Sequence, residues 1–217
     1  MDDFVSLPDL AATFLKAGKT DIPKAMTSKS LWPTLTSEQE GLVDPARTQV
    51  FIGRERHVAE ARAGHYPYPQ RTIRTKDYLF IINFKSDRYP LGDHYNLDTE
   101  REANEHELTN NTRATIPDED AGPTKAWIVV DRKSPAVKSY FEHAYGKRSR
   151  EELFGLKTDP HQMKNLAKDP EYKSVVNELR EKLFSELITT NDPRMIDDGK
   201  FFETAPMAGP VHEGKKR

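Results

Sequence analysis

Apolar and polar positions are patterned most clearly in residues 151–187. Within this stretch, Glu152–Leu156 alternates enough to predict a short, half-buried strand. A turn follows, and then Asp169 and Pro170 give a typical helix start, with a side-chain acceptor followed by proline at the first position. The apolar positions beyond it recur at helical spacing, and they are Tyr172, Val175, Val176, Leu179, Leu183 and Leu187. The pattern predicts a helix over Pro170–Leu187 whose apolar stripe covers neighbouring strands.

Upstream segments show weaker patterns of the same two kinds. The strongest strand pattern lies around Tyr78–Ile82, and Asp77 before it predicts a hairpin turn. The predicted elements, in chain order, are the helix Val5–Lys16, the strand Val50–Ile52, the hairpin strands Arg71–Thr75 and Tyr78–Asn83, the strand Trp127–Val130 and the helix Pro135–Tyr145. Short strands followed by a long helix are typical of an α+β fold, which we expect to be a small antiparallel sheet covered by the C-terminal helix.

Two stretches lack such a pattern. Asp98–Gly122 has little apolar content and is rich in acids, namely Asp98, Glu100, Glu102, Glu105, Glu107, Asp118, Glu119 and Asp120. This composition predicts an acidic insertion on the surface. After Asn191 the periodicity is lost, so residues 193–217 are predicted to be an irregular tail, with Gly209–Arg217 frayed.

Composition narrows the possible functions. The 217 residues are 35% hydrophobic and 31% charged, which predicts a modest core and long loops. A net charge of −2 argues against nucleic acid and membrane surfaces as partners. The chain contains no cysteine, so a disulfide, a thiolate metal site and a cysteine nucleophile are excluded. No apolar run approaches the ~20 residues of a membrane span.

The patterned C-terminal stretch also carries motifs. Its sequence is ELFGLKTDPHQMKNLAKDPEY, followed by LREKL, and it resembles the carboxy-terminal signature of type I sulfatases. The segment DLAATFLKAG near the start is similar to a helix of that family, with Ala12 where proline is usual. The segments GRERH and YPQRTIRTKDYL resemble the N-sulfoglucosamine sulfohydrolase (heparan sulfamidase) branch. The resemblance extends from about Val5 to Asp192.

The resemblance implies a particular domain organisation. Residues 1–55 would be the last helix and strand of a larger, alkaline-phosphatase-like α/β sulfatase domain that is missing from this chain. Residues 56–192 would form the C-terminal sulfatase subdomain, with the acidic insertion near 98–122. No basic, apolar leader follows Met1, and in a sulfatase-like sequence this indicates a late start of the chain rather than a cytosolic protein. A full-length bacterial relative would be periplasmic or extracellular.

The resemblance also implies a catalytic apparatus that the motifs here lack. Sulfatases use a formylglycine, formed from the Cys or Ser of C/S-x-P-x-R, together with a calcium ion held by oxygen ligands. The nearest match, at Ser6–Leu10, lacks the arginine. Asp2-Asp3 and Asp93-His94 mimic metal pairs but occur at the wrong places along the chain. We therefore expect no catalytic residue, no metal site and no cofactor in this chain, with calcium and formylglycine present in a full-length relative.

The candidate site follows the strand Val50–Ile52, where Arg54, Glu55, Arg56 and His57 occur in succession. An arginine fork suits a sulfate or a carboxylate, while Glu and His suit sugar hydroxyls. In an extended run the two arginines would share one face, and Glu55 and His57 the other. The alternative is a set of salt bridges between two domains. The resemblance implies that this loop borders the substrate pocket, which favours Glu55 and His57 as sugar contacts.

A wider basic character surrounds this site. Residues 47–76 hold seven Lys or Arg against two Glu, which suits either a funnel for an anionic polysaccharide or a solvated hairpin face. The implied function is hydrolysis of sulfate esters or N-sulfates of sugars, for which this chain would supply the small domain and one wall of the pocket. Two alternatives stay open, a catalytically silent module that binds glycans or a partner chain, and one half of a split sulfatase.

Overall fold

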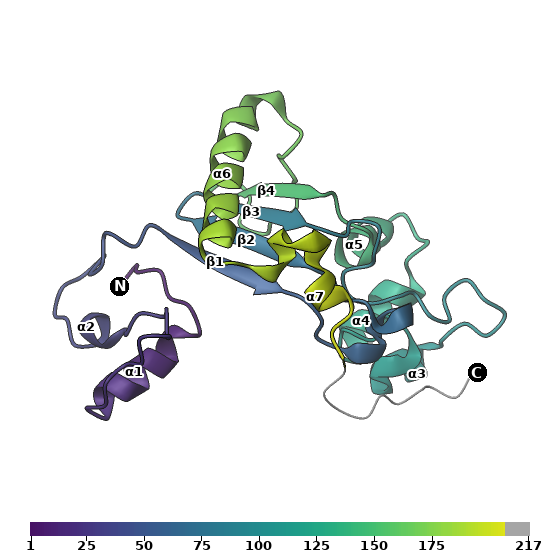
Figure 1. Ribbon diagram of the computed structural model, residues 1–217. Helices are drawn as coiled ribbons and strands as arrows, with labels where there is room; N and C mark the ends of the chain where they lie inside the picture. Colours follow the sequence, from purple (N-terminus) through teal and green to yellow (C-terminus); the bar gives the residue numbers. More distant parts are fainter. Residues whose placement is uncertain (207–217) are drawn as a thin grey trace.

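The computed structural model describes residues 1–206, and its centre is a four-stranded antiparallel sheet (Figure 1). The strands lie in chain order and are β1 (Gln49–Arg54), β2 (Gln70–Thr75), β3 (Tyr78–Asn83) and β4 (Glu151–Gly155). The predicted hairpin and the strand at Glu152–Leu156 are therefore confirmed, and so is the small antiparallel sheet of an α+β fold.

One row of apolar side chains crosses the whole sheet. The register pairs Phe51 with Ile73, Ile73 with Phe80, and Phe80 with Leu153. Helix α6 (Lys173–Thr189) lies over this row, and its stripe of Val176, Leu179, Leu183 and Leu187 belongs to the same buried cluster (Figure 1). The predicted C-terminal helix thus covers the sheet as expected. It is preceded by a turn of 3-10 helix, η4 (Pro170–Tyr172), where the Asp169 side chain accepts a hydrogen bond from the Glu171 amide.

Strand β1 belongs to this same sheet. It pairs with β2 over its whole length, so the strand expected to close a larger domain is instead the edge strand of the small sheet. Antiparallel pairing with a neighbour 16 to 26 residues away needs only a compact loop. The division of the chain at residue 55 stays a prediction, although β1, which precedes residue 55, lies in the same sheet as the strands that follow it.

The prediction of a strand at Trp127–Val130 is wrong. These residues form the end of helix α4 (Pro123–Val130), which begins with proline at a first-turn position. Ala126 and Val129 are buried while Trp127 and Val130 are exposed, which is the spacing of a helix face. The β-forming side chains of this segment predicted a strand. Packing against neighbouring elements, rather than intrinsic propensity, determines the secondary structure of so short a segment.

The acidic stretch 98–122 is more structured than its composition predicted. It contains helix α3 (Glu105–Asn110) and the 3-10 turn η3 (Thr112–Ala114). Leu108 and Ile116 are fully buried, in a second apolar cluster shared with α4 and with helix α5 (Lys138–Tyr145). The expectation of a surface excursion was wrong because a few apolar residues suffice to close a small core against α4 and α5.

The N-terminal segment, residues 1–47, contains helix α1 (Asp9–Ala17) and the short helix α2 (Trp32–Leu35). Figure 1 shows it to one side of the sheet, opposite α3, α4 and α5. Its large apolar side chains are exposed, among them Leu7, Phe14 and Leu35. The predicted helix Val5–Lys16 is confirmed in its C-terminal two thirds.

The segment that follows α6 is not irregular as far as the structure describes it. It forms two 3-10 turns, η5 (Pro193–Met195) and η6 (Asp197–Gly199), and the short helix α7 (Lys200–Glu203). Two further 3-10 turns, η1 (Ala59–Ala61) and η2 (Ala63–His65), lie between β1 and β2. The tail predicted at Gly209–Arg217 lies outside the described residues. Among residues 1–206, no helix has the length and apolar character to cross a membrane.

Candidate functional site

The candidate residues lie where β1 ends, at the junction between the sheet and the helices α3–α5. Arg54 is the last residue of β1, and the chain then bends through Glu55, Arg56 and His57 towards η1. Because the strand ends at Arg54, the four side chains do not alternate as an extended run would place them. The expected pairing of Arg54 with Arg56 on one face, and of Glu55 with His57 on the other, is wrong.

Arg54 and His57 meet on one carboxylate, that of Asp118. An Arg54 Nη2 to Asp118 Oδ2 distance of 2.5 Å and a His57 Nδ1 to Asp118 Oδ1 distance of 2.8 Å define the contacts. Buried Arg62 lies 3.5 Å from the same carboxylate and donates to the Tyr89 and Pro90 carbonyls. Burial lowers the pKa of Arg62, and the nearby Asp118 carboxylate partly offsets this effect. Asp118 is thus a buried charge that two arginines neutralise.

This arrangement fixes the His57 ring. The Asp118 side chain is fully buried, whereas 75% of the His57 side chain is exposed. A carboxylate acceptor at Nδ1 holds the proton on that nitrogen when the ring is neutral, which leaves Nε2 as a free acceptor facing solvent. Among the four candidates, His57 therefore combines a fixed orientation with a side chain that a ligand can reach.

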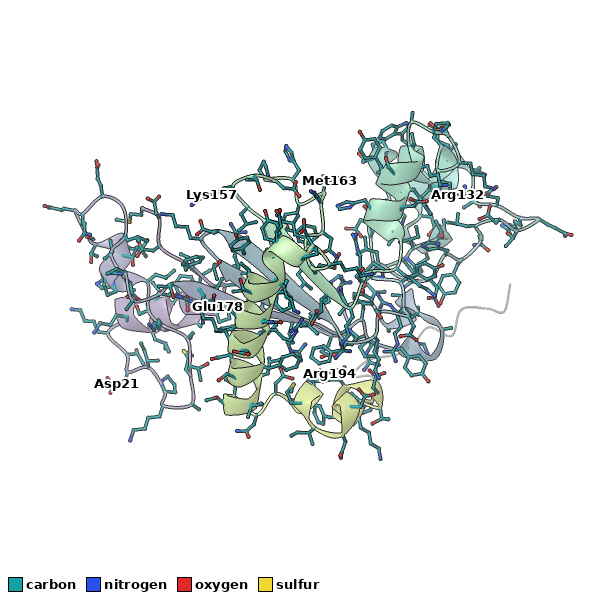
Figure 2. The ribbon with its side chains drawn as sticks, turned by 90° about the horizontal axis from the view of Figure 1, so that it is seen from above. Asp21, Arg132, Lys157, Met163, Glu178 and Arg194 are labelled. Carbon is teal, nitrogen blue, oxygen red and sulfur yellow. The ribbon has the colours of Figure 1, made fainter. Side chains whose placement is uncertain are left out.

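Glu55 points elsewhere, into a network of ion pairs beside α6. Its carboxylate lies 2.9 Å from Arg71 Nη2 and 2.5 Å from Arg194 Nη2. Arg71 also binds Asp192 at 2.6 Å, and Arg194 binds Glu203 at 2.8 Å. Figure 2 shows Arg194 where the chain leaves α6 and enters the C-terminal turns. The network fastens residues 192–203 to the end of β1 by salt bridges.

Burial and pairing act in opposite directions on the acids of this network. Burial alone would raise the pKa of Glu203, but hydrogen bonds from Arg88 and Arg194 outweigh it and hold that pKa below its ordinary value. The same balance, with Arg71 as the main partner, lowers the pKa of Asp192. Both carboxylates are therefore ionised at neutral pH, as their partners require.

Arg56 is held by the backbone. Its guanidinium donates to the His65 carbonyl and to the Ala205 carbonyl, each at 3.0 Å. Arg71, one of the basic residues for which a funnel or a solvated hairpin face was considered, is buried in the network with Glu55. Arg74 and Lys76, from the same basic stretch, are exposed. The arginines expected to bind sulfate thus have partners within the protein.

A hollow of about 490 Å³ opens beside His57. His57, Val58 and Glu60 line it from the segment after β1, and residues 110–113 line it from the end of α3 and the start of η3. Pro117, Asp118 and Asp120 complete the lining. Its volume lies within the range of about 300–1,000 Å³ that is usual for small-molecule sites.

Three of the four residues considered as metal mimics, Asp3, Asp93 and His94, have structural contacts. Asp3 accepts hydrogen bonds from the Val43 and Asp44 amides. The His94 ring stacks on Tyr89, and its Nε2 contacts the Tyr145 carbonyl. Within the described range 1–206, no three His, Cys, Asp or Glu side chains come together as a metal site would require.

Sequence reasoning missed Asp118 and Arg62. Asp118 was counted among the acids of a surface insertion, and one acid in a run of three gives no signal of burial. The one available clue was Ile116-Pro117 immediately before it, an apolar pair that could have indicated a buried turn.

Comparison with known proteins supports the resemblance seen in the motifs. No family model matches the chain. The chain is 26% identical over 222 residues to the human protein N-sulphoglucosamine sulphohydrolase, a match that covers 96% of this chain. It spans 38% of the length of that relative, a share that fits a carboxy-terminal portion.

Solved structures give further matches. One, determined in complex with its substrate D-glucosamine-2-N,6-O-disulfate, has a TM-score of 0.47 and 19% identity over 87% of this chain and 25% of its own. Another, described as a 2-O GAG sulfatase, has a TM-score of 0.45 and 19% identity over 86% of this chain and 25% of its own.

The motifs and the curated match agree on the same relative and on a partial span of it. Over nearly all of its length, the chain is similar to a portion of a sulfatase of the N-sulfoglucosamine sulfohydrolase branch.

Proposed function

We propose that this chain is the carboxy-terminal part of a sulfatase-like hydrolase that acts on sulfate esters or N-sulfates of sugars. It contributes the small domain and one wall of the substrate pocket. The observation that carries the proposal is His57, held by buried Asp118 and exposed beside a hollow, in a chain similar to an N-sulphoglucosamine sulphohydrolase.

Each candidate residue has a distinct role in this proposal. His57 Nε2 accepts a hydrogen bond from a sugar hydroxyl, while Asp118 holds the ring in place. Arg54 neutralises Asp118, and Arg56 fastens the loop to the backbone at His65. Glu55 is paired with Arg71 and Arg194, but 17% of its side chain is exposed. Its carboxylate therefore accepts a hydrogen bond from the sugar as well.

The chemical step belongs to another part of such an enzyme. The described residues do not fit a calcium site, because no cluster of three candidate ligands occurs among them. The sequence also lacks the C/S-x-P-x-R motif from which formylglycine forms. In this proposal, calcium and formylglycine lie in the amino-terminal sulfatase domain, and the present chain binds and orients the sugar.

The test is calorimetric titration of the purified chain with N-sulfoglucosamine. We expect weak binding without release of sulfate, and a loss of affinity of about fivefold or more in His57→Ala, the equivalent of one hydrogen bond. His161→Ala is the matched control, because His161 is exposed in the turn after β4, remote in sequence from the hollow. Sulfate release by the pure chain, or equal affinity for wild type and His57→Ala, would contradict the proposal.

A further inference from the structure

The two edges of the sheet are protected to different degrees. Along β4, the Leu153 amide donates to the Asn165 side chain, and the Leu153 carbonyl accepts from the Leu166 amide. The chain itself therefore covers that edge. Strand β1, at the other edge, pairs with β2 alone, and no strand among residues 1–206 lies along its outer side (Figure 1). An edge strand left open in this way is a template for another strand.

The register shows which backbone groups of β1 face outwards. The Phe84 amide donates to the Pro69 carbonyl, which places the odd-numbered residues of β2 in hydrogen bonds with β3. Because the bonds of an antiparallel ladder alternate between the two sides of a strand, the even-numbered residues of β2 bond to β1. The amides and carbonyls of Gln49, Phe51 and Gly53 therefore point away from β2. Within residues 1–206, these groups make no backbone hydrogen bond outside the β1–β2 ladder.

Strand β1 also lacks the features that usually prevent edge pairing, which are proline, lysine and a bulge. Its six residues contain neither proline nor lysine, and they pair with β2 without interruption. Ile52, near the centre of the strand, is 52% exposed. It belongs to the face of the sheet opposite α6, whose apolar side chains are outside both buried clusters, and they are Val50, Ile52, Leu79, Ile81 and Phe154.

The sequence of β1 is complementary to a second copy of itself. When two β1 strands run antiparallel about a twofold axis at Phe51, the amide and carbonyl of each Phe51 bond to those of the other copy. The pairing uses every outward-facing group of the strand, and it brings no two charges together. The other residue pairs across the two copies are Gln49 with Gly53, Val50 with Ile52, and Thr48 with Arg54.

We propose that the open edge of β1 is a self-association surface, at which two copies of this chain pair antiparallel about Phe51. The two four-stranded sheets then join into one sheet of eight strands. The partner is a second copy because this twofold pairing is self-complementary, with the same residues used on both sides. The inference does not depend on the proposed sugar-binding function.

The test combines sedimentation velocity of the purified full chain with hydrogen exchange of its backbone amides. We expect the mass to rise from that of one chain towards that of two as the concentration is raised through the micromolar range. Over the same range, the amides of Phe51 and Gly53 should exchange about tenfold more slowly or less, because each becomes hydrogen-bonded to the second copy.

One substitution is directed at the open edge. Ile52→Lys places a charge beside the pairing strand, at a side chain that is largely exposed in the single chain. Because lysine on an edge strand opposes pairing, the dissociation constant of the dimer should rise about tenfold or more. Leu7→Lys is the matched control, since it makes the same change at an apolar residue that is 82% exposed just before α1. Circular dichroism establishes that both variants are folded.

Three outcomes would overturn the inference. The first is a wild-type chain that stays monomeric at every concentration, and the second is a dimer in which the amides of Phe51 and Gly53 exchange as fast as in the monomer. The third is association that Leu7→Lys abolishes and Ile52→Lys does not, which would assign it to the N-terminal apolar side chains. The exchange measurement uses the wild-type chain alone, so it decides the matter even if Ile52→Lys does not fold.

Discussion

Helices α1 and α6 are both amphipathic, but the apolar face of α6 is buried whereas that of α1 is exposed. On α6, Leu179 and Leu183 are buried against the sheet, at 3% and 0% exposure. On and beside α1, Phe14 and Leu7 are 69% and 82% exposed. Both helices show apolar residues at helical spacing in the sequence. Periodicity therefore defines which face of a helix is apolar but does not tell whether anything in the same chain covers it.

The two regions are also held together by different forces. The N-terminal segment depends on polar contacts around Asp9, whose carboxylate accepts from the Ser6 and Lys29 amides and from Arg47. Burial alone would raise the pKa of Asp9, but these hydrogen bonds outweigh it and lower that pKa. The sheet and α6 share an apolar core and the network around Arg194. We infer that the second region carries the stability of the described chain.

The largest effect is expected at Arg194, whose fully buried guanidinium binds Glu55 and Glu203. Arg194→Ala leaves two carboxylates without their shared partner and should lower the free energy of unfolding by about 3–5 kcal/mol. Chemical denaturation of the wild type and the variant measures this loss of unfolding free energy. Arg101→Ala, at an exposed arginine, should change stability by less than about 0.5 kcal/mol. An equal, small effect of both would mean that residues 192–203 are not fastened to the sheet.

The next effect is expected in the core under α6. Leu179→Ala removes buried methyl groups and should cost about 2–5 kcal/mol of unfolding free energy. Lys173→Ala, at an exposed position of the same helix, should stay within about 0.5 kcal/mol. Denaturant titration of both variants makes the comparison. If Leu179→Ala is silent, α6 does not stabilise the sheet.

A smaller effect is expected on acidification. The pKa values of Glu203 and Asp192 lie below their ordinary values of 4.5 and 3.8, so their stabilisation is complete above those values. It is lost as the pH falls through the lowered pKa values of the folded protein. Melting temperatures should therefore begin to fall below about pH 4.5. Glu203→Gln should flatten this decline, and an unchanged decline would show that other acids cause it.

The smallest effect is expected in the N-terminal segment. Phe14→Ala removes an exposed ring and should change the unfolding free energy by less than about 0.5 kcal/mol. Deletion of residues 1–45 should likewise leave the main cooperative transition in place and improve solubility, because exposed apolar side chains are removed with it. Loss of that transition on deletion would place the segment in the main core and reverse the comparison.

The fold could be predicted where local patterns and long-range packing agree. The hairpin Arg71–Asn83, the strand near Leu153 and the helix carrying Leu179 were all predicted correctly, because each has apolar residues that pack into the same buried cluster. The prediction at Trp127–Val130 failed because its β-forming side chains lie in a helix whose buried apolar residues are Ala126 and Val129. Short segments of this kind take their structure from their neighbours.

The candidate site was predictable in part. Its position, at the end of β1, followed from the strand pattern and the resemblance. The partners of its side chains did not, because Asp118 lies 61 residues after His57 and Arg194 lies 139 residues after Glu55. Such contacts depend on the folded chain, and a single sequence carries no signal for them.

The central proposal, that His57 marks a sugar-binding wall, is tested most directly by NMR titration of the isotopically labelled chain with N-sulfoglucosamine. The proposal predicts chemical-shift changes centred on the His57 imidazole and its neighbours along the hollow, with no sulfate released and no change at the Phe14 ring of α1. Shift changes confined to other parts of the chain, or none at saturating sugar, would contradict it.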